Sequence, residues 1–223
     1  MKKLFIPLLT MSVLLVGCPY ESANPLSEPN VKVPSSILGT YEKKGAETDA
    51  IVTAKVEKIT DFHFLMTEVT NYPATAETDE MKDTVFYVSF LTKIDNDYFI
   101  NNLAYSPSNL DAMNIKIDEL KSNYKAGATA STTKIVPKIV VDTVAAEEDF
   151  EIDEYPPMPD MYYIFKVDGN FTDNKFRLRG LTKNLTNEIF KSSNDLYNYV
   201  AKYKGLSILY DKDEIYTYFR LSK

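Results

Sequence analysis

The chain has 223 residues, with 25 Lys and Arg against 32 Asp and Glu, and 44% of its residues are hydrophobic. This is the composition of a globular domain that needs neither a metal nor a disulfide to fold. The acidic balance argues against a nucleic-acid partner, because nucleic-acid phosphates are met by clustered Lys and Arg. One histidine, one cysteine and seven scattered glycines make a His/Cys zinc site and a phosphate-binding loop untenable, so we expect no cofactor and no metal.

The N-terminus has the pattern of a secretion signal. Lys2 and Lys3 precede an apolar run over residues 4–16, which ends at Gly17 and Cys18. A helix of that length, at about 1.5 Å per residue, reaches only about 20 Å, whereas the hydrocarbon core of a bilayer is roughly 30 Å thick. Residues 1–17 are therefore predicted to be a cleaved signal peptide rather than a membrane-spanning helix.

The residues at the cleavage point, Leu15-Val16-Gly17-Cys18, resemble the lipobox of bacterial lipoprotein signal peptides. The resemblance implies that Cys18 is diacylated with palmitate-type chains, becomes the first residue of the mature chain and is then acylated on its amino group. Without residues 1–17 the chain carries 23 bases against 32 acids, a net charge of −9. Two or three acyl chains anchor a protein stably, since each buried methylene contributes about 0.8 kcal/mol. We therefore expect a lipid-anchored cell-envelope protein.

Residues 18–36 are rich in Pro, Ser, Asn and Glu, and this composition predicts a flexible tether. The tether and the strand after it resemble a group of small uncharacterised lipoproteins from Bacteroidetes-type bacteria. The residues that carry this resemblance are Cys18, Tyr20, Glu21, Ser22, Pro25, Leu26, Ser27, Leu38, Gly39 and Tyr41. The resemblance implies an outer-membrane location and supplies no activity.

From residue 37 onward, apolar and polar residues alternate with a period of two, which indicates half-buried strands. A first strand begins near residue 37, and further strands are predicted over residues 50–57, 62–67, 84–94 and 98–105. Short breaks at residues 44–45, 59–61 and 95–97 favour antiparallel hairpins. The first half of the chain is therefore predicted to be a five-strand meander.

The pattern then becomes helical over residues 109–124, where apolar residues recur every three or four positions. Ser108 and Asp111 have the spacing of a capping box at its start. Residues 135–141 are predicted to form an edge strand that contains Pro137. Residues 142–160 hold eight acids, three prolines and no base, which predicts a disordered acidic insert.

The last third of the chain alternates again. Residues 161–167 and 175–181 are predicted to pair as a hairpin, and a second helix is predicted to begin at Ser192 and end near Gly205. Two short strands, over residues 206–210 and 215–221, are predicted to close the chain.

These elements predict one mainly β domain of the α+β class over residues 37–223, with about eight antiparallel strands and two helices. We slightly favour an open, curled sheet covered by helices. The alternative is a closed barrel, because Gly39-Thr40-Tyr41 on the first strand resembles the Gly-x-Trp of lipocalin-like barrels. In that resemblance Tyr41 replaces Trp, and a helix and an acidic insert interrupt the meander.

Candidate site residues are few. His63, the only histidine, lies between two phenylalanines without a nucleophile motif, so a structural role is expected. Asp149, Glu151, Asp153 and Asp160 have the spacing of a calcium loop, but Glu154 replaces the turn glycine, and a solvated loop is the better interpretation. Four strand tyrosines could line a pocket or serve the core: Tyr162, Tyr163, Tyr216 and Tyr218.

The first functional hypothesis is a non-enzymatic lipoprotein that engages another envelope protein. The second is a lipocalin-like carrier of a small apolar ligand, with a cavity lined by residues such as Val52, Val56, Phe64 and Phe90. The third is an envelope hydrolase that uses paired carboxylates. Cys18 is the one residue to which the sequence assigns a function.

Overall fold

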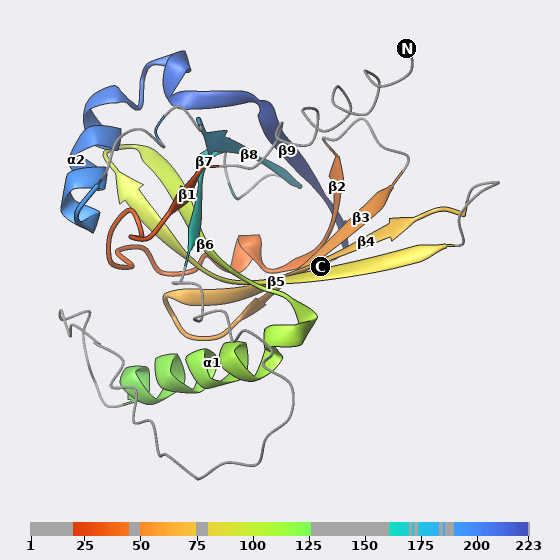
Figure 1. Ribbon diagram of the computed structural model, residues 1–223. Coiled ribbons are helices and arrows are strands. Elements are labelled where there is room, and N and C mark those ends of the chain that lie inside the picture. Colours follow the sequence, from red (N-terminus) through yellow and green to blue (C-terminus); the bar gives the residue numbers. More distant parts are fainter. Residues whose placement is uncertain are drawn as a thin grey trace, which may run out of the picture.

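The computed structural model describes residues 20–44, 50–74, 80–125, 161–169, 171, 174–182, 185 and 190–222, and Figure 1 shows their arrangement. The strands are β1 (Glu21–Ser22), β2 (Gly39–Lys44), β3 (Ile51–Lys58), β4 (His63–Tyr72), β5 (Met81–Ile94), β6 (Asp97–Tyr105), β7 (Tyr162–Asp168), β8 (Lys175–Leu181) and β9 (Tyr210–Ser222). The helices are α1 (Leu110–Lys125) and α2 (Ser193–Tyr203), with short 3-10 helices at Ser35–Ile37, Pro107–Asn109 and Ser207–Leu209.

Strands β2 to β9 form a closed antiparallel barrel. Each strand pairs with its neighbours in the sequence, and β9 returns to pair with β2. Strand β8 completes the closure by pairing with β7 on one side and with β9 on the other. A closed barrel has no edge strands, so the backbone groups along its wall are paired. The lipocalin-like barrel is therefore confirmed, and the open sheet that the sequence slightly favoured is wrong.

Most predicted elements are confirmed within a few residues, and the differences have local causes. The final pair of short strands is wrong, because the chain forms the 3-10 helix Ser207–Leu209 and then the single strand β9. Tyr210 pairs with Leu181 across a register shift, so the charged residues that follow it continue a strand instead of forming a turn.

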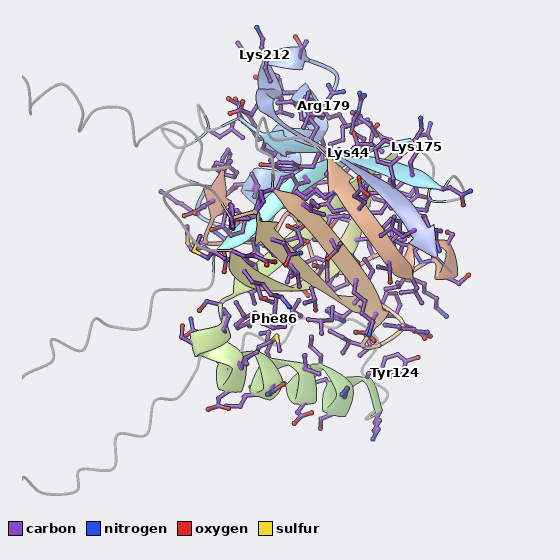
Figure 2. All side chains as sticks on the ribbon, turned by 90° about the vertical axis from the view of Figure 1, so that its right-hand side faces the viewer. Lys44, Phe86, Tyr124, Lys175, Arg179 and Lys212 are labelled. Carbon is purple, nitrogen blue, oxygen red and sulfur yellow. The ribbon has the colours of Figure 1, made fainter. Side chains whose placement is uncertain are left out.

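The two helices cover different parts of the outer wall (Figure 1). Helix α2 is capped as predicted, since the Ser192 hydroxyl accepts a hydrogen bond from the Asp195 backbone N–H at 3.2 Å, and it buries Leu196 and Val200 completely. Helix α1 buries only Met113 fully, so it is packed more lightly against the wall. Figure 2 shows Phe86 between the barrel and α1.

The start of α1 differs from the prediction. The capping box is not formed, because Ser108 belongs to the 3-10 helix Pro107–Asn109 and its hydroxyl bonds with that of Ser106 at 2.7 Å. The predicted edge strand at residues 135–141 and the acidic insert at residues 142–160, with its calcium-loop spacing, lie outside the described residues, as do residues 1–17 and Cys18.

The segment 20–36 differs from the tether that its composition predicts. Tyr20 and Leu26 are buried in the cluster beneath α2, and β1 pairs with the first residues of β7. The Leu26 backbone N–H donates to the side-chain oxygen of the buried Asn101 at 2.7 Å. These contacts hold the segment against the outer wall, and we call residues 20–33 the N-terminal strap.

Because the strands alternate in direction, their connections gather at two ends of the barrel. At one end, which we call the mouth, β2, β4, β6 and β8 finish and β3, β5, β7 and β9 begin. At the other end, the base, Val33 and Ile37 pack into the barrel core. The Tyr41 hydroxyl donates to the Ile37 carbonyl at 2.8 Å, and the Arg220 guanidinium donates to the Leu38 carbonyl at 2.9 Å. The base is therefore closed by the chain itself.

Candidate functional site

A layer of polar side chains lies inside the barrel between its apolar core and the mouth. Strands β2, β4, β5, β7 and β9 each direct at least one such side chain inward, at positions set by the period-two alternation. We call this group the polar layer; it consists of Lys43, Glu68, Tyr87, Tyr163, Tyr216 and Tyr218. Several members are in direct contact, because Glu68 bonds with Lys43 and Tyr218, and the Lys43 ammonium lies over the Tyr216 ring.

Glu68 is the centre of this layer and is only 6% exposed. One carboxylate oxygen accepts a hydrogen bond from the Tyr218 hydroxyl at 2.5 Å, and the other accepts from the Lys43 ammonium at 2.8 Å. A buried carboxylate is tolerated only when it is paired and hydrogen-bonded in this way. Lys43 and Tyr218 therefore satisfy both oxygens of the Glu68 carboxylate inside the barrel.

The Lys43 ammonium also faces aromatic rings. Its nitrogen lies 4.2 Å from the ring centroid of Tyr216 and 5.8 Å from that of Tyr218, which is cation–π geometry. The Lys43 side chain is 18% exposed, so the ammonium is shielded but still reachable from the mouth. An ammonium has three N–H donors, so the hydrogen bond to Glu68 and the contact with Tyr216 leave capacity for an acceptor in the mouth.

Two tyrosines of the layer, Tyr87 and Tyr218, remain protonated at physiological pH. Burial, reinforced by the negative charge of Glu68, raises the pKa of Tyr218 and that of Tyr87 well above the ordinary tyrosine value. On the base side of the layer, the core side chains Phe64, Met66, Leu91 and Ile100 are completely or almost completely buried. Above it, Val52 and Val85 are half-buried. The mouth thus combines hydrogen-bonding groups, aromatic faces and aliphatic walls, which together suit a small amphiphilic molecule.

The sequence identified part of this site. Val52, Val56 and Phe64 point inward as the carrier hypothesis requires, but Phe90 points outward, with its ring centroid 5.8 Å from that of His63. Phe90 is the cross-strand partner of His63, and direct partners point to the same side of a sheet. Because adjacent residues of a strand face opposite sides and Phe64 points inward, His63 and Phe90 both lie on the outer face.

Among the four strand tyrosines, Tyr162 packs in outer clusters and the other three belong to the polar layer. Sequence reasoning missed Lys43 and Glu68. A signal was present, because Lys43 follows Tyr41 and Glu68 follows Met66 by two residues, which puts both charges on the face that is otherwise apolar.

His63 has a structural environment. Its Nδ1 atom is 3.0 Å from the Thr60 hydroxyl, and burial together with the nearby charge of Lys116 lowers its pKa to about 4. The imidazole is therefore neutral at physiological pH, on the outer wall and away from the polar layer.

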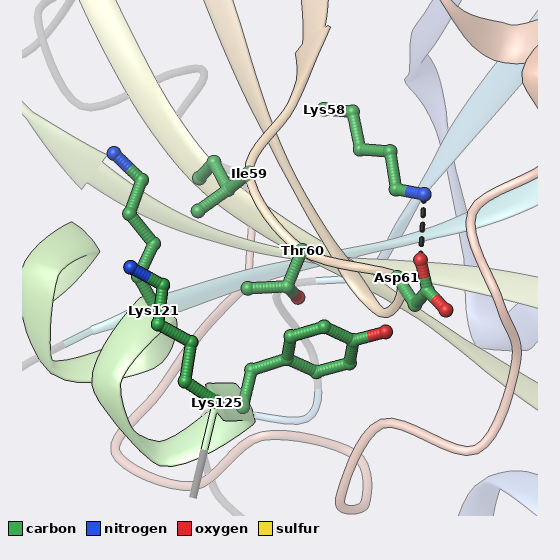
Figure 3. A pocket seen from close by; sticks show the side chains of 7 residues that line it. Lys58, Ile59, Thr60, Asp61, Lys121 and Lys125 are labelled. Carbon is green, nitrogen blue, oxygen red and sulfur yellow. Dashed lines mark hydrogen bonds and ion pairs between the residues drawn. The ribbon is translucent and has the colours of Figure 1, made fainter.

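A groove lies outside the barrel, between the end of α1 and the turn from β3 to β4 (Figure 3). This groove has a volume of about 370 Å³ and is lined by Lys58, Ile59, Thr60, Asp61, Lys121, Tyr124 and Lys125. In Figure 3 Lys58 points to Asp61, and the N–O distance of this pair is 2.6 Å. Hydrogen bonds from Lys58 and Tyr124 lower the pKa of Asp61 to about 2. These bonds fasten α1 to the turn, which accounts for the groove as a structural feature.

The fold and the polar layer define a class: an eight-stranded up-and-down barrel with a closed base and a polar, tyrosine-rich interior below its mouth. Comparisons of the chain with protein-family models, with curated proteins and with solved structures found no match. In the described part of the chain, no helix is both long enough and apolar enough to cross a membrane.

The pairing of Lys43 with Glu68 predicts a measurable coupling. Lys43→Met should lower the free energy of unfolding by about 2 kcal/mol, because it leaves a buried carboxylate with one partner. The double variant with Glu68→Met should be more stable than Lys43→Met alone, giving a coupling energy of at least about 1 kcal/mol in a denaturation cycle. The exposed pair Lys55 and Glu57, 2.8 Å apart, is the control and should show a coupling near zero. Equal coupling in both pairs would contradict the assignment.

The depressed pKa of His63 predicts a pH dependence of stability. The unfolded chain takes up a proton near pH 6.5 but the folded chain only near pH 4, so protonation of the unfolded state destabilises the fold as the pH falls between these values. His63→Asn removes the titration and should lose roughly 2 kcal/mol less than the parent between pH 7 and pH 4. Parallel stability profiles for the parent and the variant would show that His63 titrates normally.

Proposed function

We propose that the protein is a lipid-anchored binding protein of the cell envelope, and that its barrel holds a small amphiphilic molecule at the polar layer. The observation that carries this proposal is the Lys43–Glu68 pair among tyrosines below the mouth. A purely structural barrel interior is more stable when filled with apolar side chains, because burying a charge pair has a desolvation cost. A binding role gives a reason to retain the pair.

The proposal involves no catalysis. The Glu68 carboxylate of the polar layer accepts hydrogen bonds from side chains on both of its oxygens, and the Glu21 carboxylate beside the layer accepts one from the Tyr163 hydroxyl at 2.8 Å. Hydrolysis of glycosidic bonds requires two carboxyl groups on opposite sides of a substrate. The polar layer therefore supports binding better than carboxylate chemistry.

Docking of another envelope protein is a second candidate function. It is supported by Leu206 and Ile208, two exposed aliphatic side chains close together between α2 and β9. Both candidates place the protein at the membrane through acyl chains on Cys18, in the outer membrane. The lipobox-like segment supports the anchor, and the resemblance of residues 18–41 to small Bacteroidetes-type lipoproteins supports the outer membrane.

Lipidation has a direct test. The mature protein isolated from membranes should have the mass of residues 18–223 plus two or three acyl chains and a glyceryl group. The Cys18→Ser variant should carry no acyl mass and should leave the membrane fraction. A membrane-bound, unmodified parent protein would contradict the anchor.

A matched pair of variants tests ligand binding at the mouth. Val52 faces the interior and its neighbour Thr53 faces outward, and both side chains are half-buried. Val52→Trp should place a bulky ring on the mouth side of the polar layer and weaken binding of the fluorescent probe N-phenylnaphthylamine by about tenfold, which corresponds to about 1.4 kcal/mol. Thr53→Trp should bind the probe like the parent. Equal affinities for the two variants, or a parent that does not bind the probe, would argue against the mouth as the site.

A further inference from the structure

We infer that the barrel is held with its mouth against the lipid leaflet that contains the acyl chains of Cys18, so that it exchanges an amphiphile directly with the bilayer. This inference rests on the lipid anchor and the binding site of the proposed function. It adds the orientation of the barrel, the class of ligand and the route by which the ligand enters.

The position of the N-terminal strap is the first observation that supports this orientation. Glu21 pairs with Tyr163 and Ser22 pairs with Tyr162, so β1 lies where β7 begins, which is the mouth end of the barrel. Tyr20 is buried in the cluster beneath α2 and is therefore fixed to the wall. The strap is thus fixed to the barrel at the mouth end. The chain that precedes Tyr20 leads from this point to Cys18.

The short length of chain between Cys18 and this fixed point is the second observation that supports the orientation. Cys18 precedes Tyr20 by two residues, and two extended residues span at most about 7 Å. A flexible tether of residues 18–36 would have allowed the domain to stand far from the membrane, but most of that segment is packed on the barrel. An anchor of this length holds the mouth end of β7 close to the headgroups.

The side of the mouth opposite β1 has exposed apolar side chains that can contact the same lipid leaflet. Ile51 begins β3 and Met81 begins β5, and each side chain is 60% exposed. Tyr72, which ends β4 and pairs with Met81, is also exposed. In Figure 1 the adjoining ends of β4 and β5 lie across the barrel from β1. Aliphatic and aromatic side chains at this rim can enter the interfacial region of a leaflet, so the mouth is supported on both sides.

This orientation defines the ligand as a molecule of the leaflet with a polar head and an apolar tail. Its head would enter first and accept a hydrogen bond from the Lys43 ammonium of the polar layer. Its tail would lie against Val52 and Val85, which are half-buried between the polar layer and the mouth. The tail would then point toward the bilayer, and the transfer would not expose it to water.

Tryptophan fluorescence tests the orientation, because the chain contains no tryptophan. The test uses residues 18–223 coupled through Cys18, the only thiol, to a maleimide phospholipid in phosphatidylcholine vesicles. Single variants Ile51→Trp and Met81→Trp report on the mouth. Leu221→Trp reports on the base end, where β9 finishes, and is a matched control because Leu221 is 55% exposed. Circular dichroism verifies the fold of each variant.

Brominated acyl chains quench tryptophan only at close range. We expect them to reduce the emission of Ile51→Trp and Met81→Trp by about half or more, and to leave that of Leu221→Trp within about a tenth of its value in ordinary vesicles. Equal or stronger quenching at Leu221→Trp would overturn the orientation. Quenching at none of the three positions would overturn it as well, because the mouth would then lie away from the leaflet.

The design separates this inference from the proposed function. The anchor is attached chemically, so the result does not depend on whether cells acylate Cys18. Probe binding by the vesicle-free protein is measured independently with the Val52→Trp and Thr53→Trp pair. Quenching at the mouth positions without probe binding would contradict the ligand site and support the orientation. Probe binding without quenching at the mouth positions would support the ligand site and contradict entry from the bilayer.

Discussion

Closure of the sheet through β8 is the constraint on which the rest of the structure depends. Because β8 pairs with β7 and with β9, the strands form a closed wall with one interior. Side chains that are remote in the sequence then face one another across that interior. Phe165 on β7 and Tyr216 on β9 are not on paired strands, yet their ring centroids lie 6.1 Å apart inside the closed wall. Lys43, Glu68 and Tyr218 lie on β2, β4 and β9, which belong to one contiguous run of strands, and meet in the same interior.

The closed wall also gives the two ends of the barrel different properties. At the base, Arg220 donates hydrogen bonds to the carbonyls of Ser36 and Leu38 and stacks over Tyr41, with the guanidinium 5.0 Å from the ring centroid. The 3-10 helix Ser35–Ile37 is thereby held across the core. At the mouth, the polar layer is bordered by partly exposed side chains. The base is therefore closed by the chain itself, and the strap attaches at the opposite end, the mouth.

The sequence predicted the elements better than their assembly. Period-two alternation located β2 to β8, and helical periodicity located α1 and α2, because these signals are local. The pairings of β7 with β8 and of β9 with β2 join distant segments, so an open sheet and a barrel had the same local pattern. The proline-rich composition of residues 18–36 concealed the burial of Leu26 against Asn101, which depends on a partner on β6. The outward face of Phe90 was missed because residues 84–94 contain apolar residues on both faces.

Native mass spectrometry of the protein extracted from its own envelope in mild detergent tests the central claim most directly. The account predicts an additional mass of one defined small amphiphile that is retained under native conditions and lost on denaturation. That mass should be absent or strongly reduced when Val52→Trp is extracted in the same way. A protein that carries no additional mass in either form, or the same mass in both, would contradict a binding site at the mouth of the barrel.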